Sequence, residues 1–204
     1  MAETKLPDVI LASASTSRAR LLKNAGISVA IHPAAVDEDE VKHAMRGAKA
    51  PATDTAVALA ELKANRISRQ YPDAFVIGAD QMLVCNDLWF DKPIDMAHAK
   101  AHLMSLKGKT HTLANAVCVA KGGTIIWHHV NEAHLAMQNF NEAFLDAYLA
   151  AAGEDVLASV GAYQLEGMGA HLFSKIDGDF FSILGLPLLP LLDFLRSHKI
   201  GLSS

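Results

Sequence analysis

The stretch that decides the fold is AFVIGADQMLVC, residues 74–85. Its first half, AFVIGA, is a short apolar run of the kind found in strands buried on both faces of a parallel sheet. The run stops at Asp80, and the apolar residues MLVC then resume. We therefore expect a buried strand over 74–79, a second strand directly after it, and a turn at Asn86-Asp87.

Asp80 is the first candidate for chemistry. A carboxylate at the carboxyl end of a buried strand lies where open α/β sheets bind their ligands. At such a place it can hold a divalent metal ion or accept a proton from water. The alternative is a turn aspartate that only initiates the following strand.

The stretch LASASTSRARLL, residues 11–22, links an expected strand over 8–11 to an expected helix over 17–25. Backbone N–H groups at a helix N-terminus favour a bound anion, and hydroxyl and guanidinium groups would add donors. The alternative is a serine cap followed by solvated arginines. The polar residues concerned are Ser13, Ser15, Ser17, Arg18 and Arg20.

Two lysines are further candidates for binding an anion. Lys63 lies near the apolar stripe of a helix expected over 53–70, capped by Thr53 or Asp54. It either extends its ammonium group to solvent along the stripe or points into a cleft that holds anions. Lys92 lies on a short loop after Asp80, where a lysine can serve as a point charge for phosphate.

Strands and helices alternate along much of the chain, with one long hairpin in the middle. This order predicts a mixed α/β sheet with a second lobe. The remaining expected elements are helices over 95–106 and 141–152 and from about Leu186, strands over 110–120, 124–137 and 171–176, and a loop over 160–169.

Composition narrows the function classes. A net charge of −4 gives no general attraction to polymeric nucleic acid. Cys85 and Cys118 both lie in strand-like runs, which indicates buried thiols of a reduced, cytoplasmic protein. The apolar stretch over 180–192 is too short to cross a bilayer and contains two prolines, so we expect core and no membrane contact.

Several familiar motifs are incomplete. Gly108-Lys109-Thr110 is not a phosphate-binding P-loop, because Leu103 stands where that motif needs glycine. His98 and His102 are spaced as a helical pair, but no second ligand pair supports a zinc site.

Taken in order, the motifs resemble those of the Maf family of nucleoside triphosphate pyrophosphatases over nearly the whole chain. Thr16 and Ser17 depart from the family's usual Pro-Arg, and Asp91 from its glycine. The matching segments are Ser13–Arg18, Asp37-Glu38, Leu59–Ala64, Gly78–Asp80, Asp91–Pro93, Gly108–Thr112, Ala162–Gly169 and Leu184–Pro187.

The resemblance implies a mixed twisted sheet flanked by helices, an inosine-triphosphatase-like architecture, and one domain over 1–204 with two lobes and a central cleft. It implies hydrolysis of a nucleoside triphosphate to a monophosphate and diphosphate. Glu38 and Asp80 would hold a divalent metal ion, Mg²⁺ first and Mn²⁺ second, and Asp80 would accept the proton. The phosphate-binding residues would be Ser13, Ser15, Arg18, Lys63 and Lys92.

Three positions are expected to set the base preference: Ser17, Gln81 and Glu166. The pairing of Gln81 with Glu166 is similar to the family branch that prefers 7-methyl-GTP. Physically, an ionised glutamate only accepts hydrogen bonds, so it can accept the N–H groups of a guanine edge and suits a cationic methylated purine.

Two other functions stay open. One is a nucleotide-responsive regulator of septum formation without essential turnover. The other is a housekeeping enzyme of the inosine-triphosphatase type. The resemblance also implies a homodimer.

Overall fold

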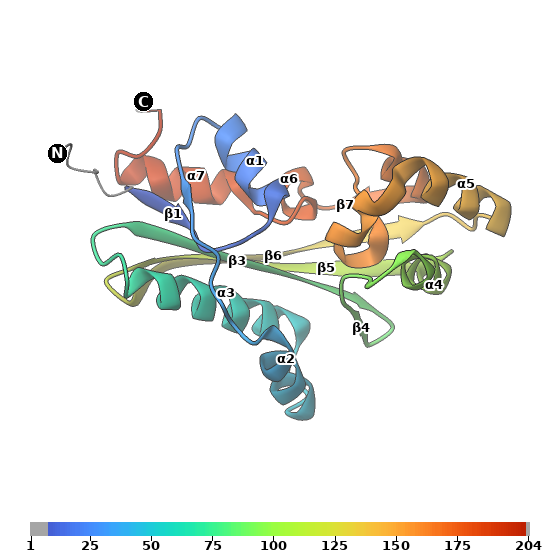
Figure 1. Cartoon of the computed structure of the whole chain (residues 1–204), viewed down its shortest axis with the longest axis horizontal. Coiled ribbons are helices and arrows are strands. Elements are labelled where there is room, and N and C mark those ends of the chain that lie inside the picture. Colours follow the sequence, from blue (N-terminus) through green and yellow to red (C-terminus); the bar gives the residue numbers. More distant parts are fainter. Residues whose placement is uncertain (1–7, 203–204) are drawn as a thin grey trace. The chain divides into compact units, whose positions relative to one another are not determined.

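The computed structural model describes residues 8–202 (Figure 1). The helices are α1 (Thr16–Asn24), α2 (Glu38–Gly47), α3 (Ala52–Ser68), α4 (Met96–Leu106), α5 (Glu142–Ala152), α6 (Phe180–Ile183) and α7 (Leu188–Ser197), with 3₁₀ turns η1 (Gly153–Ala158), η2 (Val160–Ala162) and η3 (Met168–Leu172). The strands are β1 (Val9–Leu11), β2 (Ala30–Ile31), β3 (Phe75–Cys85), β4 (Leu88–Phe90), β5 (Thr110–Lys121), β6 (Thr124–Met137) and β7 (Phe173–Asp177).

Within the described part of the chain, these strands form one mixed sheet. Their order is β2-β1-β3-β5-β6-β7, and β4 pairs with β3. β1 runs parallel to both β2 and β3, whereas β4 and β7 are antiparallel to their partners. The mixed α/β sheet that the alternating pattern predicts, and the flanking helices that the resemblance implies, are therefore confirmed.

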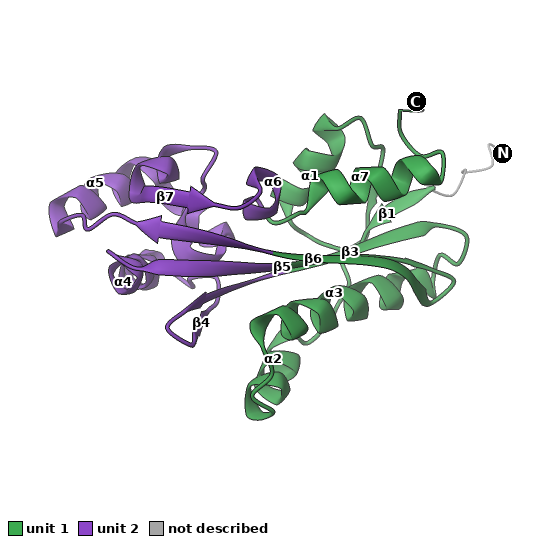
Figure 2. Ribbon diagram, turned by 180° about the vertical axis from the view of Figure 1, so that it is seen from behind, with its two compact units in different colours: residues 1–80, 115–131, 185–204 green, residues 81–114, 132–184 purple. Residues whose placement is uncertain are grey.

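The chain divides into two compact units, coloured separately in Figure 2. Unit 1 comprises residues 1–80, 115–131 and 185–204, and unit 2 comprises residues 81–114 and 132–184. In unit 1, α3 covers one face of the sheet and α1 and α7 lie over the other (Figure 1). The central cleft stays a prediction.

The expected break at Asp80 is wrong. β3 is one continuous strand, and Asp80 lies inside it rather than at a turn. Neighbouring strands pair with its backbone, and a buried charge is tolerated in a strand where an opposite charge faces it. The neighbouring parallel strand β1 ends at Leu11, opposite Ile77. Asp80 therefore lies beyond the carboxyl end of β1, although not beyond that of its own strand.

Close packing of α3 on β3 depends on small residues. A Cβ atom added to Gly78 would overlap the carbonyl oxygen of Ala60 and lie 2.8 Å from Cβ of Ala64. The glycine therefore lets the helix approach the strand two residues before Asp80. The predicted cap of this helix is wrong: α3 begins at Ala52, after Pro51, and no side chain caps it.

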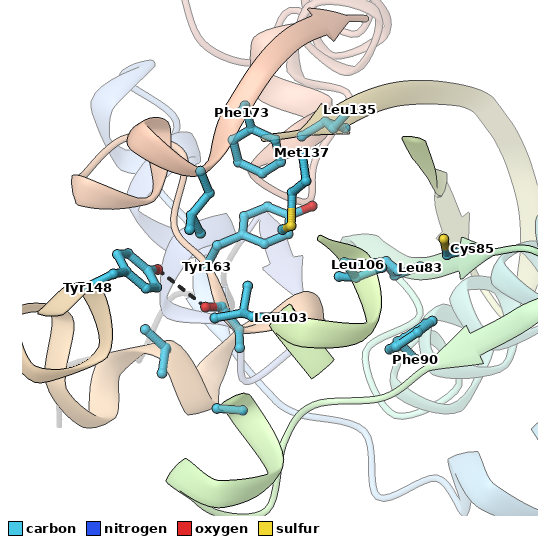
Figure 3. Packing of buried hydrophobic residues seen from close by; sticks show 14 of the residues in the cluster. Leu83, Cys85, Phe90, Leu103, Leu106, Leu135, Met137, Tyr148, Tyr163 and Phe173 are labelled. Atoms are coloured by element: carbon cyan, nitrogen blue, oxygen red, sulfur yellow. Dashed lines mark hydrogen bonds between the residues drawn. The ribbon is translucent and has the colours of Figure 1, made fainter. Parts of the chain in front are cut away.

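Unit 2 has its own apolar core. Side chains from α4, β6 and the 3₁₀ turns pack together there, and the Tyr148 hydroxyl donates to the carbonyl of Ala162 at 3.3 Å (Figure 3). Cys85, in this cluster, and Cys118, in unit 1, are buried free thiols, as expected. Burial raises the pKa of Cys118 to about 12.

The apolar stretch over 180–192 forms α6 and the start of α7. Sequence reasoning missed α6, which is only one turn long, and placed the last helix two residues early. Pro187 precedes its first residue. Among residues 8–202, no helix has both the length and the apolar character needed to cross a bilayer.

Candidate active site

The turn after β1 is built around serine oxygens. Ser15 is the N-cap of α1, and its Oγ accepts from the backbone N–H of Arg18 at 3.4 Å. Ser13, which is buried, accepts from the backbone N–H of Ser15 at 3.2 Å. The capping explanation is thus correct for Ser15, but it does not account for the burial of Ser13. Arg20 is exposed.

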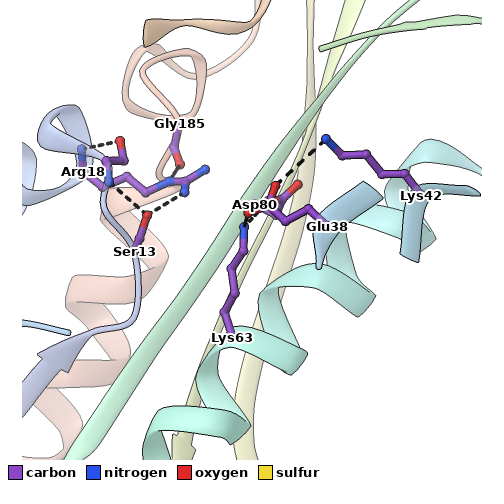
Figure 4. A network of polar contacts seen from close by, with 8 residues as sticks. Ser13, Arg18, Glu38, Lys42, Lys63, Asp80 and Gly185 are labelled. Atoms are coloured by element: carbon purple, nitrogen blue, oxygen red, sulfur yellow. Dashed lines mark hydrogen bonds and ion pairs between the residues drawn. The ribbon is translucent and has the colours of Figure 1, made fainter. Parts of the chain in front are cut away.

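Arg18 is held by two contacts that lie on this turn and on a distant segment (Figure 4). Its Nη1 donates to Oγ of Ser13 at 3.1 Å, and its Nε donates to the carbonyl of Gly185 at 2.8 Å. Burial lowers the pKa of Arg18, and the carboxylates of Asp80 and Glu38 act in the opposite direction. These effects place the guanidinium in a partly desolvated, acidic environment.

A second cluster joins three elements of unit 1. Nζ of Lys63, on α3, lies 2.7 Å from Oδ1 of Asp80 on β3 and 2.6 Å from Oε1 of Glu38 on α2 (Figure 4). The side chains of Lys63 and Asp80 are each 8% exposed, whereas that of Glu38 is 42% exposed. Lys63 therefore does not extend to solvent, because its charge is balanced inside the protein.

α2 presents Glu38 to this cluster. Asp37 caps the helix by accepting from the backbone N–H of Glu40 at 3.0 Å, so Glu38 occupies the first helical position. Lys42, one turn later, lies 4.0 Å from Glu38. Carboxylates are favoured in the first turn of a helix. This preference explains why a helix begins at the acidic residues Glu38, Asp39 and Glu40.

Sequence reasoning missed two residues of this region. Lys42 could have been found from its i,i+4 spacing to Glu38. Gly185 was matched only as part of a motif, although its backbone carbonyl orients Arg18. Its φ of +98° falls in a region that favours glycine. A backbone acceptor leaves no side-chain signal in a sequence.

The specificity candidates have different surroundings. Ser17 lies in the first turn of α1 and is half-buried. Gln81 follows Asp80 on β3 and so points to the other face of the strand; its amide donates to the carbonyls of Ser182 and Ile183 at 3.0 and 3.2 Å. Glu166 is exposed between η2 and η3.

Lys92 is exposed on the loop after β4. Within unit 1 the structure brings together the predicted residues Ser13, Ser15 and Arg18 on one side, and Glu38, Lys63 and Asp80 on the other. Lys92, Gln81 and Glu166 belong to unit 2.

The donor set fits a hard divalent cation. Mg²⁺ takes oxygen ligands and is often bound by one or two carboxylates, with water and substrate phosphate filling its other positions. Glu38 and Asp80 supply two carboxylates that face the same point. Among residues 8–202, no group of three or more histidine, cysteine, aspartate or glutamate side chains could hold a metal ion.

The fold and the site together define a class: a mixed α/β protein with an arginine- and serine-lined helix N-terminus beside a pair of carboxylates. A family model described as "Maf-like protein" matches residues 8–198. The chain belongs to the Maf family.

Curated relatives match almost end to end. The chain is 56% identical to "Nucleoside triphosphate pyrophosphatase" of Granulibacter bethesdensis, covering 94% of this chain and 97% of the relative. It is 48% identical to the protein of the same name from Rhodospirillum rubrum, covering 97% and 98%. It is also 46% identical to "7-methyl-GTP pyrophosphatase" of Rhizobium johnstonii, covering 93% and 96%.

Proposed function

We propose that this protein hydrolyses nucleoside triphosphates to a nucleoside monophosphate and diphosphate. The observation that carries the proposal is the buried Lys63–Asp80 pair joined to Glu38, in the same unit as Arg18 and the N-terminus of α1. Such a group supplies positive charge for phosphates and a carboxylate for proton transfer in one place. The names of the related proteins support the same reaction.

Substrate binding is assigned to the turn over 13–18. The Ser13 and Ser15 hydroxyls, the Arg18 guanidinium and the backbone N–H groups at the start of α1 would donate to phosphate oxygens. Arg18 is already oriented by Ser13 and Gly185, so little side-chain entropy is lost when the anion binds. Lys63 and Lys92 would neutralise the charge that collects on the departing diphosphate.

In the chemical step, a water oxygen attacks the α-phosphorus, and the bond from that phosphorus to the bridging oxygen of the β-phosphate breaks. Asp80 would take the proton of the attacking water. Glu38 and Asp80 would hold a divalent ion, Mg²⁺ or Mn²⁺, which when bound neutralises phosphate oxygens and lowers the pKa of water. The electron pair leaves with the diphosphate, so the step is balanced without any redox partner.

The base preference is assigned to Ser17, Gln81 and Glu166, with 7-methyl-GTP as the favoured modified substrate. Glu166 would accept the N–H groups of the guanine edge, and its negative charge would favour the cationic methylated ring. The amide nitrogen of Gln81 donates to the carbonyls of Ser182 and Ile183, which orients this side chain. A cytoplasmic location and a homodimer are further expectations of this proposal.

The test is a panel of 7-methyl-GTP, GTP, dTTP, UTP, ITP and XTP with Mg²⁺, assayed for diphosphate with the wild-type protein and Glu166→Gln. We expect diphosphate release, fastest from 7-methyl-GTP, and a loss of that preference of about tenfold in Glu166→Gln, which corresponds to about 1.4 kcal/mol.

The panel also separates the alternatives. If the protein binds nucleotides tightly but releases diphosphate from none of them, the result supports the regulator of septum formation instead. A preference for ITP or XTP would indicate the inosine-triphosphatase type. An unchanged preference in Glu166→Gln would remove Glu166 from base recognition.

A further inference from the structure

Lys63 occupies the point at which the two carboxylates converge. Its Nζ contacts Glu38 at 2.6 Å and Asp80 at 2.7 Å, and its side chain is 8% exposed (Figure 4). Two of its three ammonium protons can therefore be directed at carboxylates. A lysine in this state has little capacity left for phosphate oxygens.

The Lys63 ammonium balances the charges of the Glu38 and Asp80 carboxylates. Two neighbouring carboxylates repel each other unless a cation lies between them, and Asp80 is buried. The Lys63 ammonium supplies that cation and keeps both side chains directed at one point. The lysine thus holds together two carboxylates, the kind of side chain that binds divalent ions.

The backbone that carries Lys63 is fixed, but its side chain can rotate. The close contact of Gly78 with Ala60 and Ala64 sets the distance between α3 and β3. The lysine side chain is a flexible four-carbon stem that ends in a compact ammonium group. We therefore expect Nζ to change partners by rotation of the side chain rather than by movement of α3 or β3.

Resting on the function proposed above, we propose that Lys63 is a placeholder for the divalent ion. The ion displaces Nζ from Glu38 and Asp80, and the released ammonium then turns to the phosphate oxygens of the substrate. One lysine thus serves two sets of partners, and its charge becomes available to substrate only when the carboxylates are bound to metal.

This role predicts effects of opposite sign for one substitution. Lys63→Met removes the competitor for the carboxylates, so it should tighten the binding of Mn²⁺ alone. The same substitution removes a phosphate partner, so it should lower kcat/KM for the triphosphate. A lysine that only supported the structure of the site would weaken both.

The experiment measures binding of Mn²⁺ without nucleotide, by calorimetry and by electron paramagnetic resonance of the free ion. We expect the Kd of Lys63→Met to be about tenfold lower than that of wild type, equivalent to about 1.4 kcal/mol. Lys42→Met is the matched control, because it removes the same charge 4.0 Å from Glu38, whereas Lys63 contacts Glu38 and Asp80 at 2.6 and 2.7 Å; the Kd of Lys42→Met should change less than about threefold. Unchanged or weaker Mn²⁺ binding by Lys63→Met overturns the proposal.

A measurement on the wild-type protein keeps the proposal falsifiable if Lys63→Met does not fold. Lysine labelled with ¹³C and ¹⁵N is titrated with Mg²⁺, and the Lys63 signal is assigned with Lys63→Arg. We expect the Lys63 side-chain resonances to move with the ion and the Lys42 resonances to move less. A stationary Lys63 signal at saturating Mg²⁺ contradicts the exchange.

The readouts separate this inference from the proposed function. Mn²⁺ and Mg²⁺ binding need no turnover, so absent diphosphate release in every assay rejects the function and leaves the metal result standing. Conversely, normal release with unchanged Mn²⁺ binding in Lys63→Met rejects only the placeholder role.

Discussion

At the scale of single residues, the proposed chemistry depends on a buried carboxylate. Asp80 is 6% exposed and lies 2.7 Å from the Lys63 ammonium. A neutral amide of the same shape would fill the space, but it would neither accept a proton from water nor attract a divalent ion. Replacing the Asp80 carboxylate by an amide therefore tests the role of its charge while its shape is kept.

Asp80→Asn should reduce kcat by at least about a hundredfold, because general base catalysis contributes about 10² to 10⁴ in rate. The measurement is diphosphate release at saturating substrate and Mg²⁺. Asp73→Asn is a suitable control, since Asp73 is an exposed aspartate before β3. Turnover close to wild type in Asp80→Asn would remove this residue from the chemistry.

At the scale of elements, α3 and β3 position the charged cluster through their closeness. The two elements bring Lys63 and Asp80 together across a contact that leaves no room for a side chain at Gly78. The small buried residues Ala60 and Ala64 on α3 face Gly78 and allow the same close approach. The packing of α3 against β3 therefore also sets the position of Lys63 relative to Asp80.

Gly78→Ala should destabilise the protein by about 1–3 kcal/mol through overpacking, since the added methyl meets backbone rather than a movable side-chain end. Thermal unfolding measures the loss. Gly47→Ala, on α2 with no neighbouring atom near an added Cβ, is the matched control and should not destabilise the protein, because alanine is favoured over glycine in a helix. Equal unfolding temperatures for wild type and Gly78→Ala would contradict this account of the packing.

At the scale of the whole molecule, the pH dependence of unfolding contains a contribution from a buried histidine. His111 is 1% exposed, and its Nε2 lies 2.8 Å from the Tyr163 hydroxyl. Burial lowers the pKa of His111 from 6.5 to about 4. Between these two values the unfolded chain binds a proton that the folded chain does not, so stability falls as the pH falls.

The contribution of His111 is therefore complete above about pH 6.5 and is lost toward pH 4, by about 3 kcal/mol in total. Urea unfolding at pH 7 and pH 5 checks this for wild type and His111→Asn, which cannot titrate in this range. The variant should be less stable at pH 7 and should show a shallower pH dependence. Parallel changes in the two proteins would assign the effect to other groups.

Local patterns predicted most elements well because each carries its own signal. The helices expected over 95–106 and 141–152 are present as α4 and α5, which Asp95 and Asn141 cap, and Gly122 and Gly123 lie between β5 and β6. The break expected at Asp80 was wrong because pairing with neighbouring strands, which no local pattern shows, overrides a single charged residue. α6 was missed because one helical turn has little periodicity.

The sequence by itself determined the alternation of strands and helices, the buried apolar segments and the residue types of the site, because these follow from composition, periodicity and motif order. Tertiary structure alone decided which charges meet. Lys63 and Asp80 are seventeen positions apart, and Arg18 donates to a carbonyl far along the chain at Gly185. The physical reason is that a sequence states which groups can ionise or donate, whereas their partners depend on the spacing of helices and strands that packing sets.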